Sequence, residues 1–278
     1  MEKSQPRVLI VVLNYRTYEL TIELIKKLKD LMYDNYEIMV VDNCSPNESS
    51  AVLEKESEKK HFLFYANKTN DGYAAGNNIG IRYAYEHGYE YTWILNNDVI
   101  ILSQNVLQHM VDIIQQHKSV AAIGPKIITR DNLVCAPYCR RPTFKSLTYG
   151  ISVERNYRRQ FNDTPRKVYR VYGCCMLLDT KKMQEVNYMD ERTFLYSEED
   201  ILAERLLKKG YVAYYDPEVE IKHNESSSMK EVPRGKKKMI IRSRDKSRKL
   251  YLGEYRGFNN IEILIVNAVQ DCIAVIRK

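Results

Sequence analysis

Long hydrophobic runs are missing from this chain. None of its apolar stretches reaches the roughly 18 consecutive residues that a membrane-spanning helix needs, so we do not expect an integral membrane protein. The first residues include no small-residue cleavage site behind an apolar core, and we therefore expect no secretory signal there. Internal repeats and low-complexity tracts are also missing from the sequence.

Cysteine pairs at the spacing of metal or redox sites are absent as well. The six cysteines form no C-x-x-C pair and no zinc-ribbon pattern. Without a secretory signal, we expect reduced thiols in a cytoplasmic protein. Apolar residues make up 44% of the 278 positions, which is enough to build a core and excludes disorder as the dominant state.

Positive charge is concentrated in one segment. The net charge is +7, and residues 230–249 alone carry ten Lys or Arg against two acidic residues. Such a segment attracts phosphate groups, whether they belong to a lipid headgroup, a nucleotide or a nucleic acid. It contains no aromatic side chain that could stack on bases, so we do not expect a nucleic-acid partner.

Short apolar runs alternate with helical patterns along the first half of the chain. We expect strands at 8–13, 36–41, 61–66, 91–95 and 121–128, with helices at 17–31, 48–60, 73–87 and 104–117. This order predicts an α/β fold with a mostly parallel central sheet flanked by helices. The second half is less regular, with a turn-rich segment at 131–170, strands at 171–178, 211–215 and 219–221, and helices at 197–209 and 261–276.

Polar residues follow three of the predicted strands. They are Asn14, Asp42 and the turn Asn96-Asn97-Asp98, and ligands of parallel α/β sheets bind beyond the carboxyl ends of the strands. The carboxylate of Asp98 can bind Mg²⁺ or Mn²⁺ through oxygen, and Asp42 can accept hydrogen bonds from a base or ribose. Taken singly, the Asn96-Asn97-Asp98 turn and Asp42 are each better explained as a turn or cap.

Three further patterns bear on chemistry. The run from Asn70 to Gly80 places glycines and asparagines at the mouth of a helix, where backbone N–H groups can approach phosphate or sugar, although it is not G-x-G-x-x-G. The cluster Glu198-Glu199-Asp200 can supply a general base, because neighbouring carboxylates raise one another's pKa. His223 follows a strand and is coherent as a metal partner of Asp98. Each pattern also has a structural explanation. The Asn70–Gly80 run can be a tight strand–helix connection, the carboxylates can be an acidic helix start, and His223 can be a structural histidine.

The order and spacing of these segments together resemble family 2 glycosyltransferases with a GT-A fold, particularly the bacterial rhamnosyltransferase-like branch. The resemblance spans residues 7–228, and its most specific pieces are N-x-G-x-x-x-G-N-N from Asn70 and F-L-Y-x-E-E from Phe194, followed by K-K-G-Y. Other matching pieces are Val11–Tyr15, Val40–Asn43, Leu95–Asp98, Gly173–Leu178 and Ile221–His223.

The resemblance implies a role for each matched residue. Asp98 takes the place of the family's metal-binding carboxylate, with Asn96 where the family has a first Asp, and His223 joins it near Mn²⁺ or Mg²⁺. Glu199 is favoured as the catalytic base, with Glu198 and Asp200 as alternates. The residues implied to bind the donor are Asn14, Asp42, Asn70, Gly72, Asn77, Asn96 and Asn97.

The implied activity is inverting transfer of a sugar from a UDP- or dTDP-linked donor to a hydroxyl of a glycan or polyprenyl-diphosphate-linked acceptor, in the synthesis of a bacterial surface polysaccharide. We expect a glycosyltransferase domain at 1–228 and a basic, helical extension at 229–278, which either contacts the cytoplasmic face of a membrane or packs on the body. The oligomeric state stays open. The alternatives are a sugar-1-phosphate nucleotidyltransferase, whose glycine-rich loop is missing after the first strand, and a non-catalytic protein that binds nucleic acid or membrane through its basic segment.

Overall fold

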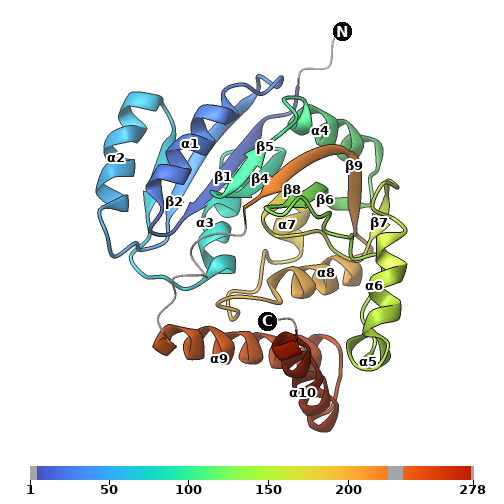
Figure 1. The fold of residues 1–278 in the computed structure, drawn as a ribbon. Helices are drawn as coiled ribbons and strands as arrows, with labels where there is room; N and C mark the ends of the chain where they lie inside the picture. The colour runs from blue at the N-terminus through green and yellow to red at the C-terminus, as the bar shows by residue number, and fades with distance from the viewer. Residues whose placement is uncertain (1–4, 225–233, 277–278) are drawn as a thin grey trace.

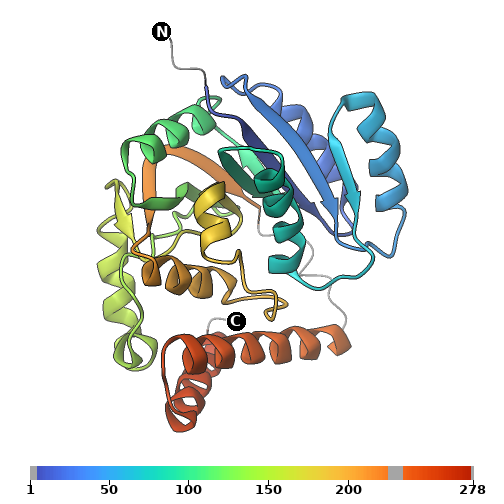
Figure 2. The same ribbon diagram turned by 180° about the vertical axis from the view of Figure 1, so that it is seen from behind.

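The computed structural model describes residues 5–224 and 234–276, and within these ranges nine strands form one sheet with helices on both faces (Figures 1 and 2). The strands are β1 (Val8–Asn14), β2 (Tyr36–Asp42), β3 (Leu63–Ala66), β4 (Tyr91–Asn96), β5 (Val99–Ile101), β6 (Val120–Thr129), β7 (Arg166–Val168), β8 (Cys175–Asp179) and β9 (Val212–His223). Their order across the sheet is β3-β2-β1-β4-β8-β6-β9-β5, and β7 pairs with β9.

The first half of the sheet is parallel, as the strand–helix alternation predicts. β1 lies between β2 and β4, with Asn14 opposite Asp42 and Leu13 opposite Asn96. The carboxyl ends of these strands therefore share one edge. The second half is mixed, because β8 runs antiparallel to both β4 and β6 while β6 and β9 are parallel.

The helices are α1 (Tyr18–Leu28), α2 (Ser49–Lys60), α3 (Tyr73–Glu86), α4 (Val106–Gln116), α5 (Phe144–Leu147), α6 (Ile151–Arg159), α7 (Thr180–Glu185), α8 (Glu198–Lys208), α9 (Arg234–Leu250), the π-helical turn η1 (Tyr251–Tyr255) and α10 (Asn260–Ile276). Alternate residues of each strand face opposite sides of the sheet. In β1, Val8, Ile10 and Val12 belong to a core shared with α1 and α4, whereas Leu9 and Val11 belong to a core shared with α3, α7 and α8.

Parts of the second half differ from the sequence-based expectation. The turn-rich segment 131–170 contains α5, α6 and β7, and the two short strands expected at 211–215 and 219–221 are one strand, β9. The register of β9 against β6 shifts between Pro125 and Lys126, and this irregularity explains the break in the apolar pattern. The basic segment is a helix, α9, over the part that the structure describes.

The C-terminal extension packs on the body rather than standing apart from it. Tyr251 and Leu252 of η1 and Ile263 and Val266 of α10 form a buried cluster with Ile201 of α8. Figure 1 shows α9 and α10 (red) along the side of the molecule where α8 lies. Within residues 5–224 and 234–276, no helix combines the length and apolarity needed to cross a membrane.

Candidate active site

The shared edge of β1 and β2 holds a buried hydrogen-bond network. The Asn14 amide donates to Asp42 Oδ1 at 2.6 Å, and the hydroxyl and backbone N–H of Ser45 donate to Asp42 Oδ1 and Oδ2 at 2.6 and 2.9 Å. Asn14 and Asp42 are 0% and 1% exposed. Their side chains are thus bonded to each other and to the turn that follows β2.

Asn97 extends this network beyond the end of β4. Its amide donates to Asn14 Oδ1 at 3.2 Å, to the Thr17 hydroxyl at 2.8 Å and to the Thr21 hydroxyl at 3.0 Å. The structure therefore brings Asn14, Asp42 and Asn97 together, with Asn14 bonded to both of the others. Because their polar atoms bind one another, they hold the strand ends in a common register.

The Asn70–Gly80 run contacts the backbone of the segment that leads into α8. Gly72 has a φ of +101°, and a Cβ at this position would lie 2.2 Å from the Phe194 carbonyl oxygen. That same carbonyl accepts a hydrogen bond from the Tyr73 N–H at 2.9 Å. The Asn70 side chain accepts from the Gly72 N–H at 3.2 Å, and Asn77 is buried with an Oδ1 that has no hydrogen-bond partner. Glycine at position 72 is required by both the dihedral angle and the close approach.

Asp98 and His223, the two metal ligands expected from the sequence, lie side by side. The register of β5 with β9 places Val99 opposite His223, and His223 Nε2 is 3.2 Å from Asp98 Oδ1. Asp98 Oδ1 is buried and accepts no hydrogen bond. A carboxylate oxygen and an imidazole nitrogen 3.2 Å apart fit two ligands of a Mn²⁺ or Mg²⁺ ion. Within the described residues no third His, Cys, Asp or Glu side chain joins them in a cluster that could hold a metal ion, so other oxygen ligands, such as those of substrate or water, would have to complete the coordination.

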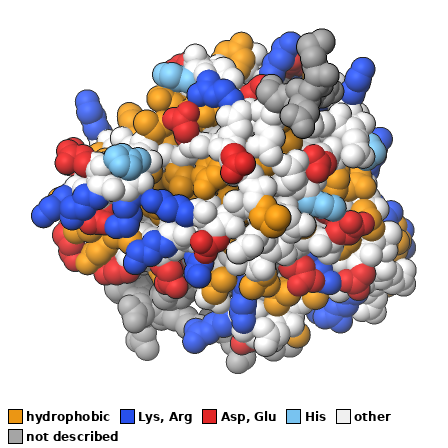
Figure 3. All heavy atoms as spheres, turned by 90° about the horizontal axis from the view of Figure 1, so that it is seen from above, with side chains coloured by type: hydrophobic (Ala, Val, Ile, Leu, Met, Phe, Trp, Pro, Cys, Tyr) orange, Lys and Arg blue, Asp and Glu red, His pale blue; other side chains and the backbone are white. Residues whose placement is uncertain are grey.

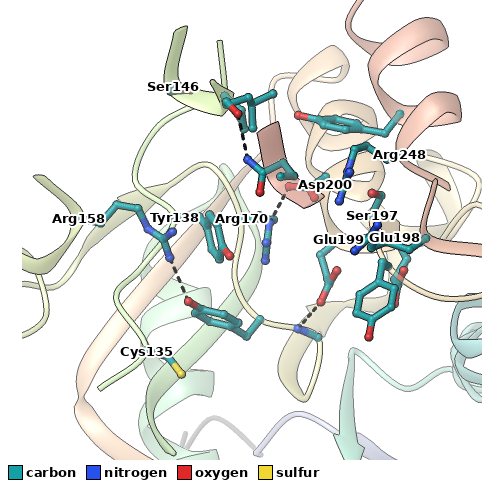
Figure 4. A pocket seen from close by; sticks show the side chains of 18 of the residues that line it. Cys135, Tyr138, Ser146, Arg158, Arg170, Ser197, Glu198, Glu199, Asp200 and Arg248 are labelled. Carbon is teal, nitrogen blue, oxygen red and sulfur yellow. Dashed lines mark hydrogen bonds and ion pairs between the residues drawn. The ribbon is translucent and has the colours of Figure 1, made fainter. Parts of the chain in front are cut away.

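The carboxylate cluster sits at the start of α8 on a strained turn. Tyr196 and Ser197 have φ values of +70° and +65°, a conformation that costs non-glycine residues of order 1–3 kcal/mol each. This turn brings Glu198, Glu199 and Asp200 to the wall of a cleft (Figure 4). Strain of this kind is concentrated at functional sites.

The three carboxylates have different environments. Glu198 is 5% exposed, its Oε2 lacks a hydrogen-bond partner, and burial, with the nearby charge of Glu199, raises its pKa well above the ordinary value. Asp200 is paired with Arg170 at 2.7 Å; burial raises its pKa, and the Arg170 charge opposes that rise. Glu199 accepts a hydrogen bond from the Gly173 N–H at 3.0 Å and is partly exposed to the cleft.

The cleft has a volume of about 680 Å³ and joins three parts of the chain. Its walls include Asn96 and His223 from the strand ends, the α8 carboxylates, side chains of α5 and α6, and residues of α9, η1 and α10. In Figure 4, Arg158, Tyr138 and Arg170 lie on one side of the cleft and Arg248 and Ser197 on the other. The remaining predicted donor residues do not line the cleft within the part of the chain that the structure describes; they are Asn14, Asp42, Asn70, Gly72, Asn77 and Asn97.

Several residues of the cleft were not identified as site residues from the sequence. Gly173 lies between Glu199 and the Tyr73 hydroxyl, which donates to the Gly173 carbonyl. Arg170 neutralises Asp200, and Arg248 comes from the basic segment. The apolar run around Gly173 indicates only that this residue belongs to a strand. Nothing in the sequence spacing between Arg170, Arg248 and α8 indicates that they lie together.

Residues 8–186 match the family model described as glycosyl transferase family 2. The low-salt glycan biosynthesis hexosyltransferase Agl10 of Haloferax volcanii is 27% identical over 196 residues, which cover 68% of this chain and 58% of that protein. The chain thus spans little more than half the length of this relative.

Two solved structures share the fold. The mannosyltransferase PcManGT of Pyrobaculum calidifontis, in complex with GDP-Man and Mn²⁺, matches with a TM-score of 0.62 and 16% identity, covering 96% of this chain and 69% of that one. TarS of S. aureus matches with a TM-score of 0.58 and 14% identity, covering 88% and 40%. The expected GT-A fold is confirmed.

Proposed function

Since the chain belongs to glycosyl transferase family 2, we propose that it is an inverting enzyme that moves a sugar from a UDP- or dTDP-linked donor to a hydroxyl of a glycan or polyprenyl-diphosphate-linked acceptor. The observation that carries the proposal is the cleft in which Glu199 faces the strand ends that bear Asn96 and His223. A base and a diphosphate site on opposite sides of one cleft are what an in-line displacement requires. The rhamnosyltransferase-like branch and a role in bacterial surface polysaccharide synthesis belong to the same proposal.

Glu199 is the base in this proposal. Its carboxylate is oriented by the Gly173 N–H and is partly exposed to the cleft. Burial favours the protonated form of Glu198, and Asp200 is occupied by Arg170, so neither alternate offers an equally free carboxylate. Glu199 takes the proton of the acceptor hydroxyl, the oxygen attacks the anomeric carbon, and the nucleoside diphosphate leaves from the opposite face.

The donor site in this proposal lies at the strand ends. Asn14, Asp42 and Asn97 hold the ends of β1, β2 and β4, and the loop through Asn70, Gly72 and Asn77 lies next to the end of β2. Asp98 and His223 would hold Mn²⁺ or Mg²⁺, which when bound neutralises charge on the departing diphosphate. The PcManGT complex, which holds GDP-Man and Mn²⁺ on a similar fold, supports a metal-dependent nucleotide-sugar site here.

The domain division at 228/229 and a peripheral membrane contact are part of the proposal. The outward side of α9 exposes Arg242, Lys246 and Lys249, and α10 exposes Ile261 and Leu264. Basic residues near an anionic lipid surface contribute about 1 kcal/mol each. The opposite face, shown in Figure 3, has both charge signs interspersed. We therefore place the enzyme at the cytoplasmic face of the membrane, with α9 and α10 toward the lipid.

Thermal stability with UDP, dTDP, GDP and CMP, each with and without Mn²⁺, tests the donor site. A ligand at a hundredfold excess over its Kd stabilises the folded state by about 2.7 kcal/mol. We expect a Mn²⁺-dependent shift with UDP or dTDP. A shift with neither nucleotide would contradict the proposed donor class.

Isosteric variants of the carboxylates test the base. We expect Glu199→Gln to keep the nucleotide-induced shift and to lose transfer, while Asp200→Asn and Glu198→Gln serve as the competing assignments. Full transfer by Glu199→Gln would refute Glu199 as the base.

Binding of the protein to vesicles with and without anionic lipid tests the membrane contact. The proposed contact predicts salt-sensitive binding to the anionic vesicles alone.

A further inference from the structure

Helix α9 presents two arginines to the cleft instead of the apolar face expected of a packed helix. Arg244 and Arg248 lie one turn apart, and both line the cleft. Arg242, Lys246 and Lys249 are exposed on the other side of the helix. The basic segment is therefore divided between a solvent face and a cleft face, and only the cleft face can act on a bound substrate.

The two cleft arginines differ in their partners on α10. Arg244 donates to Asp271 at 2.6 Å and also pairs with Asp245 at 2.9 Å, so two carboxylates neutralise it. Arg248 donates to the neutral amide oxygen of Asn267 at 2.8 Å. Among the residues that the structure describes, no carboxylate lies within ion-pair distance of the Arg248 guanidinium.

Burying the positive charge of Arg248 without a nearby anion costs free energy. Burial, together with the charge of Arg244, lowers the pKa of Arg248 from its ordinary value, so the environment disfavours its charge. Figure 4 shows Arg248 next to Asp200, but that carboxylate is already bonded to Arg170 at 2.7 Å. A partly buried cation that no described carboxylate contacts directly is expected where a ligand brings the negative charge.

We propose that Arg248 binds a phosphate of a diphosphate group in the cleft, so that the C-terminal extension completes the active site. This inference rests on the proposed function for the identity of the diphosphate, which belongs to either the acceptor or the donor. The acceptor is favoured, because Arg248 lies beside the α8 carboxylates, where the acceptor hydroxyl must meet Glu199. An acceptor diphosphate held by Arg248 would set the distance between that hydroxyl and the base.

Binding of inorganic pyrophosphate in the absence of divalent metal tests the site directly, by calorimetry on the full chain. We expect Arg248→Gln to weaken this binding about ten- to hundredfold, the loss typical of a charge-assisted hydrogen bond. Lys249→Gln is the matched control, since it removes the same charge from the next, exposed position and should leave the affinity unchanged. Equal affinities of Arg248→Gln and Lys249→Gln would overturn the proposal.

Arg248→Lys covers the case in which the glutamine variant does not fold. Lysine keeps the charge but cannot form two parallel hydrogen bonds, so we expect a smaller loss of affinity, about threefold to tenfold. Unchanged pyrophosphate affinity in the lysine variant, with the glutamine variant unfolded, would count against the proposal.

Binding of organic diphosphates shows whether the acceptor or the donor supplies the diphosphate that Arg248 binds. If the acceptor supplies the group, Arg248→Gln weakens binding of farnesyl diphosphate and not of UDP or dTDP with Mn²⁺; if the donor supplies it, the reverse holds. Loss of neither would overturn the proposal. A protein that binds pyrophosphate through Arg248 but transfers no sugar would keep this site while refuting the proposed function.

Discussion

Replacing Gly173 with alanine should disable the proposed base without unfolding the protein. A Cβ at this position would lie 2.6 Å from Glu199 Oε1 and 3.2 Å from Glu199 Cδ. Ordinary van der Waals contact begins near 3.4 Å, so the carboxylate must retreat by about 0.8 Å. A misplacement of about 1 Å costs about a hundredfold in rate, which is about 2.7 kcal/mol of transition-state stabilisation.

The assay is the steady-state rate of transfer at saturating donor, with the Tm and the nucleotide-induced stabilisation as controls. We expect kcat to fall about a hundredfold in Gly173→Ala while donor binding is retained, because the strand-end network is not touched. Gly253→Ala is the matched control, since its Cβ would meet only Ile263 Cδ1 at 3.7 Å. A Gly173→Ala enzyme with wild-type kcat, in a protein whose Glu199→Gln variant is inactive, would refute the positioning of Glu199 by Gly173.

Three further predictions concern stability and metal binding. Gly72→Ala should destabilise the fold by about 1–3 kcal/mol more than Gly88→Ala, as measured by urea unfolding, because both have positive φ but only Gly72 would clash with Phe194. Glu198→Gln should gain Tm relative to wild type as pH rises above 4.5. Burial raises the pKa of Glu198 in the folded protein, so the stability that this residue contributes is complete only below its pKa in the unfolded chain. That contribution is lost as the pH rises toward the pKa in the folded protein. An advantage that shrinks between pH 4 and pH 7 would contradict this. Asp98→Ala should abolish the Mn²⁺-dependent part of nucleotide binding, and a Mn²⁺ effect retained in this variant would place the metal elsewhere.

Local patterns predicted the strands and helices in the first half of the chain, apart from the three-residue strand β5. The β-branched runs that became β1, β2 and β4 are buried on both faces, so a continuous apolar stretch and a polar residue at its end determine strand and boundary together. The pairing of Asn14 with Asp42 follows from the parallel register. Prediction was weaker at 131–170, where α5 and α6 are short and none of their residues is buried, so no buried apolar face marks either helix.

The candidate site divides in the same way. Sequence alone identified the residue types: polar strand ends, glycines and asparagines at the mouth of a helix, adjacent carboxylates and a histidine after a strand. Only the tertiary structure distinguished three neighbouring carboxylates, because burial of Glu198, the Arg170 partner of Asp200 and the Gly173 N–H at Glu199 all come from segments distant in the chain. The basic segment shows the same limit: its composition predicted phosphate binding, but only the packing of α9 against α10 decided that Arg248 faces the cleft while Lys249 faces solvent, since helix rotation is determined by the partner it packs on.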